Sequence, residues 1–587
     1  MSGFAVGLGR RGQPPDRRTQ RAVAEGFAPW PKPGSRSSGP VVMLSSGWPS
    51  SGPGARGGAV PLACGDARLD PPTASLEQAW RERGEGWVLG LRGEFSCALW
   101  LKGEGRLDAV RDPLGIKPLY FALAAGELWL SNLPGALLTL PGLDSSLDDT
   151  AVLDHLLFDR CREPEATVWK GIRRVPPGHR LTWTSGDSLA VEKWAGEPLA
   201  LAPSGSPGRR LEAEEVAEEL RRLLDAAVAR RLPEHGRVSI WMSGGLDSTA
   251  VAASVAACGG RGVAHTVTYD RLIADREGDL AHRAARHLAM PHRAHALDDD
   301  PLYRGWRELP PSPLPDDPAS DAAYREIDER ALEHSETALT GFGGDPLLLP
   351  DRDWWRGGGP AWWKPALFVR SWLETGSRPP LGLAGARARA RLARRWRDGF
   401  PPWLAKDFAA RTGALERYRD LTLPAARRDS PRGDRREAME QSYDAGWADL
   451  FEKLDAGSRL VPIRRFHPFF DADLMGFLLS LPSLPWCLEK RALRLAMAPR
   501  LPRAIVHRPK TPLAGEPWPG LQADLEALWG QWREAAPEVD GFIDFQALRA
   551  AWRAAGSAAR GHAAVEQALA FACWLGRARR GRLAQGP

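Results

Sequence analysis

Short apolar runs, separated by glycine and proline, fill the first third of the chain. Runs of this kind, bounded by turn residues, are typical of strands. They predict four successive strands at residues 95–101, 107–111, 118–124 and 127–132. Closely spaced strands favour a layered sheet domain, which we expect over residues 1–196. Residues 32–58 are rich in Gly, Ser and Pro and are expected to form a loop within it.

The pattern changes after a Pro-, Gly- and Ser-rich segment at 197–210, which we interpret as a linker. Beyond it, apolar residues recur at helical spacing along 211–232, on the stripe formed by Val216, Leu220, Leu223, Leu224 and Val228. An apolar strand at 238–242, a helix, a strand at 263–269 and a helix at 279–290 follow. This β-α-β-α alternation predicts a doubly wound parallel sheet in an α/β domain spanning 211–587.

The last part of the chain is expected to be helical from about residue 434, where Leu474, Phe477, Leu478 and Leu481 keep a helical spacing. Residues 350–432 show no regular period, contain an arginine-rich run and are expected to be irregular. The chain has 25 tryptophans, with Trp354, Trp355, Trp362 and Trp363 close together. Such a cluster lines a substrate-binding surface or packs into a core, and the sequence leaves both interpretations open.

Composition narrows the class of protein only a little. The net charge of +6 suits an enzyme that handles phosphates, and we expect no nucleic-acid partner. Six cysteines contain no CxxC pair, which argues against a zinc site and favours a reducing, cytoplasmic environment. No stretch approaches the roughly 18 apolar residues of a membrane-spanning helix, so no membrane association is expected.

The most informative segment is SGGLDS, which runs from Ser243 through Gly244, Gly245, Leu246 and Asp247 to Ser248. It lies directly after a predicted strand and directly before a predicted helix. Glycines let the backbone curl around an anion, and the helix N-terminus offers unpaired N–H groups. The two serines add hydroxyl donors, and Asp247 is suited to hold Mg²⁺. The segment therefore predicts a phosphate-binding loop.

SGGLDS resembles the pyrophosphate loop of the ATP-pyrophosphatases. Residues 93–122, 171–183, 467–482 and 501–513 resemble segments of one branch of these enzymes, the asparagine synthetase family. The resemblance implies an N-terminal glutaminase-like domain, an Ntn-type αββα sandwich, followed by an ATP-pyrophosphatase domain with a helical C-terminal part. It also implies the activity, in which ATP activates a carboxylate as an acyl-adenylate and an amine then forms an amide. The implied cofactors are ATP and Mg²⁺.

The resemblance assigns roles to residues outside SGGLDS. Asp345, in the segment TGFGGD, would be a second magnesium carboxylate facing Asp247, and Lys510 would stabilise the charge that builds up in the transition state. Asp247, Asp345 and Lys510 are therefore the candidate catalytic residues. Arg508 is a lesser candidate for the same anion site. By position, the candidate adenine contacts are Met242, Val267, Thr340 and Gly341.

Two departures from the family pattern bear on the reaction. Glutamine-dependent members carry a nucleophilic cysteine after the first Met, whereas here Ser2 stands there, and a serine with no evident base is a far poorer nucleophile. We therefore expect a glutaminase-like domain that releases no ammonia. The second residue of the GxGxD segment is a glutamate in asparagine synthetases and a tyrosine in β-lactam synthetases. Here it is Phe342, which cannot take a proton.

Tyr269–Leu272 with Asp275 and Glu277, and Pro315–Pro318 before Tyr324, look most similar to the lasso-peptide cyclases. That resemblance implies that an Asp or Glu side chain of a ribosomal precursor peptide is adenylated and that the peptide's N-terminal amine closes a macrolactam. The implied partners are the precursor peptide, a leader peptidase and a leader-recognition protein. The alternatives are an asparagine synthetase or a β-lactam-synthetase-like enzyme acting on a small amino acid. A non-catalytic scaffold and a tRNA-modifying enzyme are opposed by the intact Asp247, Asp345 and Lys510 and by the lack of a CxxC pair.

Overall fold

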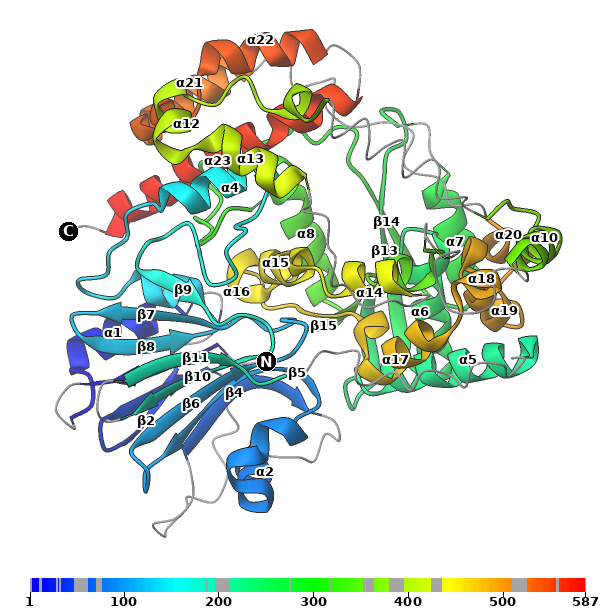
Figure 1. Ribbon diagram of the computed structural model, residues 1–587, viewed down its shortest axis with the longest axis horizontal. Coiled ribbons are helices and arrows are strands. Elements are labelled where there is room, and N and C mark those ends of the chain that lie inside the picture. Colours follow the sequence, from blue (N-terminus) through cyan, green and yellow to red (C-terminus); the bar gives the residue numbers. More distant parts are fainter. Residues whose placement is uncertain are drawn as a thin grey trace.

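The computed structural model describes residues 3–9, 13–27, 30, 33–46, 62–69, 76–184, 188–195, 212–273, 276–316, 318–351, 354, 364–379, 395–423, 435–508, 525–555 and 559–585. Two antiparallel sheets form the N-terminal part, and a parallel sheet with helices forms the second part (Figure 1). This is the expected α/β architecture, an Ntn-type αββα sandwich followed by a doubly wound domain.

The N-terminal sandwich stacks a six-stranded sheet, in the order β2-β3-β1-β8-β7-β9, on a five-stranded sheet, in the order β11-β10-β6-β5-β4. Period-2 alternation explains the stacking: in β1 (Phe4–Leu8), Phe4 and Val6 face the core between the sheets, while Ala5 faces the outer core. The other strands are β2 (Gly34–Ser38), β3 (Val41–Ser45), β4 (Leu62–Leu69), β5 (Gly93–Leu101), β6 (Arg106–Arg111), β7 (Tyr120–Ala124), β8 (Glu127–Ser131), β9 (Ile172–Arg174), β10 (His179–Thr184) and β11 (Ser188–Lys193).

The helices of this part are α1 (Arg17–Glu25), α2 (Leu76–Arg83), η2 (Gly84–Gly90), α3 (Pro134–Leu138) and α4 (Asp149–Phe158). The four predicted strands are confirmed as β5 to β8. The loop predicted at 32–58 is wrong in part, because β2 and β3 pair there as antiparallel neighbours. The apolar run Val41–Leu44 pairs with β1 and is buried, so local apolar pattern outweighs the surrounding Gly and Ser. Residues 47–58 lie outside the described residues.

The second sheet is parallel, in the order β14-β13-β12-β15-β16. Its strands are β12 (Arg237–Trp241), β13 (Arg261–Thr268), β14 (His292–Ala296), β15 (Thr337–Leu339) and β16 (Arg464–Phe466). One face is covered by α5 (Ala213–Ala229), whose predicted apolar stripe is buried, and by α6 (Leu246–Ala257). The other face is covered by α8 (Asp321–Leu332), which packs through Ala323, Ile327 and Ala331. Helices on both faces make the sheet doubly wound.

The remaining helices complete the second domain and its C-terminal part. They are α7 (Glu277–His287), η4 (Pro318–Ser320), α9 (Gly344–Leu348), α10 (Lys364–Thr375), η7 (Trp396–Gly399), α12 (Lys406–Thr412), α13 (Ala414–Thr422), α14 (Arg436–Ser442), α15 (Ala445–Leu454), α16 (Ala456–Arg459), η8 (Pro468–Phe470), α17 (Ala472–Ser480), α18 (Ser483–Trp486), η9 (Leu488–Lys490), α19 (Arg491–Met497), α20 (Arg503–Val506), α21 (Leu525–Ala535), η11 (Pro537–Gly541), α22 (Phe545–Ala555) and α23 (Ala559–Gln585). Residues 350–432 are thus partly helical, contrary to the expectation of irregular structure.

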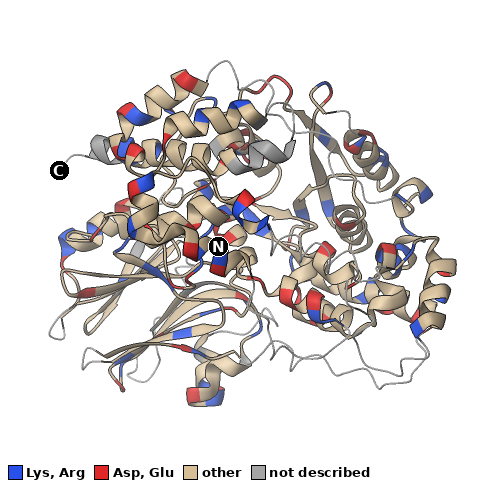
Figure 2. Ribbon diagram, turned by 45° about the horizontal axis from the view of Figure 1, so that its top comes forward, with Lys and Arg blue, Asp and Glu red and all other residues tan. Residues whose placement is uncertain are grey.

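The charged residues are distributed along these elements with both signs interspersed over the helices of the described chain (Figure 2). Among the described residues, no helix is both long enough and apolar enough to cross a membrane.

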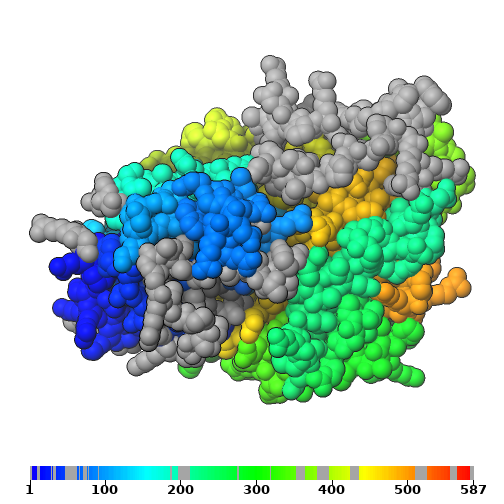
Figure 3. Space-filling model, turned by 90° about the horizontal axis from the view of Figure 1, so that it is seen from below, coloured from blue at the N-terminus to red at the C-terminus, as the bar shows by residue number. Residues whose placement is uncertain are grey.

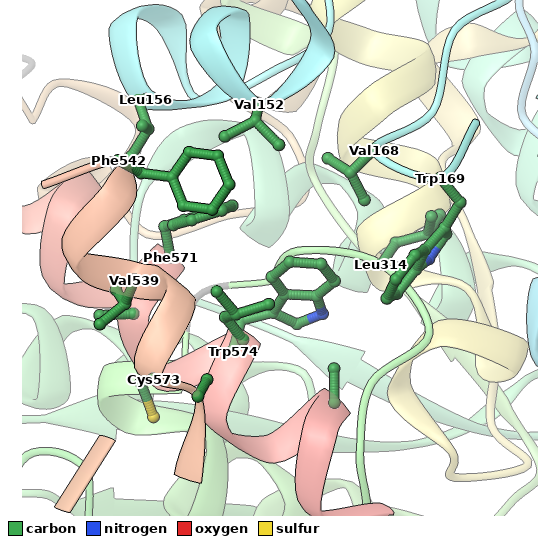
Figure 4. Packing of buried hydrophobic residues seen from close by; sticks show 14 of the residues in the cluster. Val152, Leu156, Val168, Trp169, Leu314, Val539, Phe542, Phe571, Cys573 and Trp574 are labelled. Atoms are coloured by element: carbon green, nitrogen blue, oxygen red, sulfur yellow. The ribbon is translucent and has the colours of Figure 1, made fainter. Parts of the chain in front are cut away.

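A large apolar core is shared between the N-terminal sandwich and the C-terminal helices. Val152 and Leu156 of α4 pack with Phe542, Phe571 and Trp574 (Figure 4). Trp574 of α23 lies with its ring centroid 5.5 Å from that of Trp169. Buried tryptophans from both regions fill this core: Trp129, Trp169, Trp306, Trp403, Trp529, Trp532, Trp552 and Trp574.

This core explains much of the tryptophan content as packing. Trp354 is also buried, against Leu484 and Leu488, which rules it out as part of an open substrate-binding surface. Trp355, Trp362 and Trp363 lie outside the described residues. Of the two interpretations of the tryptophan cluster, packing into a core therefore holds for Trp354, and the substrate-binding surface does not.

Buried ion pairs also join the two domains, which lie directly against each other in the space-filling view (Figure 3). Arg231, which follows α5, lies 2.6 Å from a carboxylate oxygen of Glu94 in β5 and 3.0 Å from one of Asp471. Glu452 of α15 pairs with Arg111 at 2.9 Å and with Arg174 at 2.8 Å. Burial alone would raise the pKa of Glu452, but the Arg174 and Arg111 guanidiniums outweigh it and hold that pKa below its usual range.

These pairs predict that Arg231→Ala strongly destabilises the protein. The change leaves Glu94 buried without this cation, and breaking a buried ion pair costs about 3–5 kcal/mol. The matched control is Arg222→Ala on α5, where the arginine side chain is 64% exposed and a change within about 0.5 kcal/mol is expected. Urea denaturation followed by tryptophan fluorescence measures both. Equal denaturation midpoints for the two variants would contradict the structural role of Arg231.

Candidate functional site

Two glycine-rich loops lie side by side at the carboxyl edge of the parallel sheet. β12 ends at Trp241 and leads into SGGLDS, and β15 ends at Leu339 and leads into the segment from Thr340 to Asp345. β12 and β15 are paired parallel neighbours, with Ile240 opposite Leu339. Loops that follow neighbouring parallel strands meet at one edge, which is where ligands bind in open α/β sheets.

Glycine is required where the two loops touch. A Cβ on Gly341 would lie 2.5 Å from the backbone nitrogen of Ser248. A Cβ on Gly344 would lie 2.5 Å from the carboxylate carbon of Asp247. Real side chains do not tolerate contacts this short, so these glycines let the second loop approach the first carboxylate closely.

SGGLDS has the geometry of an anion cradle at the start of α6. The Ser243 backbone N–H donates to the Ser248 hydroxyl at 3.2 Å, and the two serine hydroxyl oxygens are 3.4 Å apart. The Thr249 hydroxyl donates to the Gly245 carbonyl at 2.6 Å. Hydroxyl groups thus gather beside the N-terminal turn of a helix of 12 residues, whose dipole favours a negatively charged ligand.

Asp247 and Asp345 share one cation, the ammonium of Lys490. The Lys490 Nζ lies 2.6 Å from Asp345 Oδ1 and forms a second, shorter ion pair with Asp247 Oδ2. The lysine side chain is only 10% exposed, whereas that of Asp345 is 44% exposed. The two predicted carboxylates therefore lie within reach of a single positive charge.

Lys490 was missed by the analysis of the sequence. It lies in the short charged run Glu489–Arg491 between apolar helical segments, and no local period or glycine motif marks it. Both Glu489 and Lys490 have left-handed backbone conformations, with φ of 52° and 55°. Such conformations in residues other than glycine cost on the order of 1–3 kcal/mol each and cluster at functional sites.

The donor set fits Mg²⁺. Magnesium is usually bound through one or two carboxylates, with phosphate oxygens and water completing an octahedron. Asp247 and Asp345 supply two carboxylates, and the position of the Lys490 ammonium shows that a cation is accommodated between them. In the part of the chain that the structure describes, no group of three or more His, Cys, Asp or Glu side chains could hold a metal ion.

Thr340 and His467 hold the second loop from behind. The Thr340 hydroxyl lies 2.7 Å from His467 Nδ1 and accepts the Phe342 backbone N–H at 3.3 Å. Burial lowers the pKa of His467 to about 3, so its ring is neutral at physiological pH. The Phe342 ring lies 5.7 Å from the His467 ring and 6.5 Å from that of Trp447. Phe342 is nevertheless 41% exposed, so it presents an apolar surface beside Asp345.

Arg508 forms an ion pair with Glu277, the first residue of α7, which lies beside SGGLDS. Its guanidinium lies 3.3 Å from Glu277, and the Glu277 carbonyl in turn lies 2.7 Å from where a Gly244 Cβ would stand. Arg494 donates to the carbonyls of Glu489, Val506 and Arg508, which ties the Lys490 turn to the segment that leads toward Lys510. Lys510 itself lies outside the described residues, and its role stays a prediction.

Of the candidate adenine contacts, Met242 is buried in the core and its carbonyl accepts the Thr266 hydroxyl at 2.6 Å. Val267, near the end of β13, is partly buried against the α8 side of the sheet. Thr340 and Gly341 lie at the junction of the two loops, as described above. Met242 directly follows β12 and Val267 lies near the end of β13, so both are at the carboxyl edge of the sheet, and their contact with a base stays a prediction.

The two segments that look cyclase-like lie in different places. Glu277 starts α7 beside SGGLDS, whereas Asp316 lies 3.5 Å from Arg577 of α23 and forms an ion pair there. Tyr324 of α8 is 40% exposed. Asp275 and Asp317 lie outside the described residues, as does Ser2.

Comparison with known proteins identifies relatives over most of the chain. A family model of asparagine synthase matches residues 219–576, and a glutamine amidotransferase domain model matches residues 69–195. A putative glutamine-hydrolysing asparagine synthetase of Mycobacterium tuberculosis (strain ATCC 25618 / H37Rv) is 26% identical over 502 residues, which cover 78% of this chain and 72% of that protein. Glutamine-hydrolysing asparagine synthetase 3 of Bacillus subtilis (strain 168) is 29% identical over 185 residues, covering 31% of this chain and 29% of that protein.

The solved structure of an allosteric regulatory enzyme of purine biosynthesis covers 52% of this chain and 82% of its own, at 8% identity and a TM-score of 0.23.

The carboxylate pair predicts that Asp247→Asn or Asp345→Asn abolishes cleavage of ATP to AMP and pyrophosphate. Each change removes one of the two negative charges that would hold Mg²⁺ at the phosphates. Asp299→Asn is the control, because Asp299 is 89% exposed and belongs to neither loop. Pyrophosphate release is measured, and circular dichroism checks the fold. Normal pyrophosphate release by Asp345→Asn would remove this residue from the site.

Lys490→Ala is expected to leave two neighbouring carboxylates without their shared cation. We expect a loss of about 1–2 kcal/mol in the free energy of unfolding, since Asp345 is partly exposed and its charge is partly screened. Millimolar Mg²⁺ should restore more stability to this variant than to the unaltered protein, because it replaces the missing positive charge. Thermal unfolding with and without Mg²⁺ tests this. An identical response to Mg²⁺ in both proteins would contradict the shared-cation arrangement.

Proposed function

The chain belongs to the asparagine synthase family, and on that premise we propose that it closes a macrolactam in a ribosomal precursor peptide, as lasso-peptide cyclases do. It is an ATP-dependent, amide-forming ligase of this family. The proposed substrate is a peptide with a free N-terminal amine and an internal Asp or Glu. The proposed partners are that precursor peptide, a leader peptidase and a leader-recognition protein, and the proposed metal is Mg²⁺.

The observation that supports a peptide amine most directly is Phe342. Its exposed ring stands beside Asp345, at the position where glutamate or tyrosine stands in the small-substrate enzymes that this segment resembles. Phenylalanine cannot take a proton from an attacking amine. A peptide N-terminal amine has a pKa of about 7.7–8.0, against about 10.4 for a lysine amine, so a substantial fraction is already neutral near pH 7.5. Such a nucleophile depends less on a protein base.

The identity of residue 2 supports this proposal. Ser2 directly precedes Gly3 and Phe4 of β1, where glutamine-dependent members carry the nucleophilic cysteine. A serine hydroxyl without a base is a weak nucleophile toward an amide. In the structure, the sandwich instead provides a face of the shared core on which the C-terminal helices pack.

The proposed reaction has two steps. A carboxylate oxygen of the peptide attacks the α-phosphorus of ATP, and pyrophosphate leaves. The N-terminal amine then attacks the acyl carbon, an amide C–N bond forms, the C–O bond to AMP breaks, and the amine loses a proton to solvent. SGGLDS would hold the pyrophosphate through its N–H and hydroxyl groups, Asp247 and Asp345 would hold Mg²⁺, which neutralises phosphate charge, and Lys510 and Arg508 would stabilise the negative charge of the transition state.

Asparagine formation from aspartate is the second candidate function. It is favoured by the match over 502 residues to a putative glutamine-hydrolysing asparagine synthetase. The two candidates differ in the source of the amine, which makes them separable by experiment.

The test incubates the full chain with ATP, Mg²⁺ and a leader-free precursor peptide that has a free N-terminus. Mass spectrometry should show the loss of one water from the peptide, and the rate should rise with pH through about 7.7–8.0 as the amine loses its proton. Acetylating the peptide N-terminus should stop the loss of water, because the nucleophile is gone while the carboxylate remains. Ser2→Ala should leave the rate unchanged.

In the same experiment, aspartate with ammonia or glutamine serves as the competing substrate. Formation of asparagine at a useful rate, with no peptide ever dehydrated, would overturn the cyclase proposal in favour of the second candidate.

The Lys510→Ala variant should fold and bind ATP, yet its turnover should be about a hundredfold slower, as expected for the loss of an oxyanion-type donor.

A further inference from the structure

A pocket lies at the amino ends of the parallel strands, opposite the two glycine-rich loops. It has a volume of about 500 Å³. Its lining includes the first residues of four strands, Arg237 of β12, Arg261 of β13, Thr337 of β15 and Arg464 of β16. Since the loops follow the carboxyl ends of β12 and β15, this pocket is separated from the candidate ATP site by the length of the strands. Neither the proposed reaction nor the family resemblance assigns it a role.

The charges around the pocket are not balanced. Two carboxylates line it, and each already has an arginine partner: Glu336 lies 3.0 Å from Arg464, and Glu333 lies 3.3 Å from Arg293, which is outside the lining. Arg237 and Arg261 remain. Within the described part of the chain, the Arg237 guanidinium forms no hydrogen bond or ion pair, and that of Arg261 donates only to the His235 carbonyl, at 2.7 Å. Two guanidiniums therefore face the pocket without a carboxylate.

The neighbouring groups add donors to these cations. His235 Nδ1 accepts the Arg237 backbone N–H at 3.1 Å, so in the neutral ring the proton is on Nε2, which can donate to a ligand. Ser335 donates its hydroxyl to the Arg237 carbonyl at 2.8 Å and accepts the Thr337 N–H at 3.0 Å, which fixes the start of β12 against the start of β15. The arginines thus project from a rigid strand edge.

We propose that this pocket binds a small organic anion that carries a phosphate or carboxylate group, held by Arg237 and Arg261. Paired guanidiniums match the geometry of both groups through parallel N–H donors. A volume of about 500 Å³ lies in the range of pockets that bind whole organic solutes, so the pocket exceeds the size of a bare ion. Binding of an anion in this pocket does not depend on the proposed cyclase reaction, so the two can be tested separately.

Equilibrium dialysis of the full chain tests the proposal with two labelled probes, inorganic phosphate and malonate. The ATP site is first saturated with a non-hydrolysable ATP analogue and Mg²⁺. We expect about one equivalent of at least one probe to bind at low salt, with the affinity falling as salt is raised. Binding of phosphate alone assigns the site to phosphate compounds, and binding of malonate alone assigns it to carboxylates.

The double variant Arg237→Gln/Arg261→Gln should weaken binding at least tenfold. Both arginines are exposed, so the fold should be kept, which circular dichroism checks. The control variant Arg222→Gln/Arg283→Gln removes the same charge from exposed positions elsewhere and should bind like the unaltered protein. Absence of a bound equivalent of either probe, or equal affinity in the two double variants, would overturn the proposal.

Discussion

The candidate site depends on keeping two carboxylates close together, which like charges resist. Asp247 and Asp345 come from separate loops, and the glycines at 341 and 344 let those loops touch. The Lys490 ammonium contacts both carboxylates and offsets their repulsion. Lys490 is held in turn by a left-handed turn whose Glu489 carbonyl accepts the Arg494 guanidinium. The site is thus organised around a position for positive charge, which a metal ion with its triphosphate can take over. The order of the strands, the glycines of the two loops and the turn at Lys490 together hold the two carboxylates close to one positive charge.

Much of this arrangement could be predicted from local patterns in the sequence and from the family resemblance. Apolar runs bounded by turn residues located β5 to β8, β12 and β13, and helical spacing located α5. The β-α-β-α alternation located α6 and α7, the SGGLDS segment located the first loop, and the family resemblance located the second. Lys490 could not be found in this way, because its proximity to Asp247 arises only from tertiary folding across more than two hundred residues. The β2–β3 hairpin was missed because Gly and Ser around Val41 concealed an apolar run whose partner, β1, is distant in the sequence. The tryptophans at 354 and 574 also show that burial of aromatic residues depends on partners that no local period reveals.

The sequence suggests two separate domains, but in the structure the two parts pack extensively against each other. Apolar side chains of the sandwich and of the C-terminal helices share one core, and Arg231, Glu94 and Asp471 add buried charge across the same boundary. Any other arrangement of the two parts would separate these charged side chains, and each would then be buried without its partner, which is energetically costly. The sandwich therefore has a structural reason to be present whether or not it hydrolyses glutamine.

The shared core has a consequence for how the chain is made. During synthesis the sandwich emerges before α23, the helix that carries Phe571 and Trp574, because α23 follows it by several hundred residues along the chain. Until then, one apolar face of the sandwich around Trp169 lacks its cover. Nascent domains ordinarily fold as units from the N-terminus, and surfaces left uncovered in that interval are prone to aggregation. Contacts between residues as far apart in sequence as Trp169 and Trp574 also slow folding. The face around Trp169 is therefore the surface of the sandwich that we expect to promote aggregation before α23 packs on it.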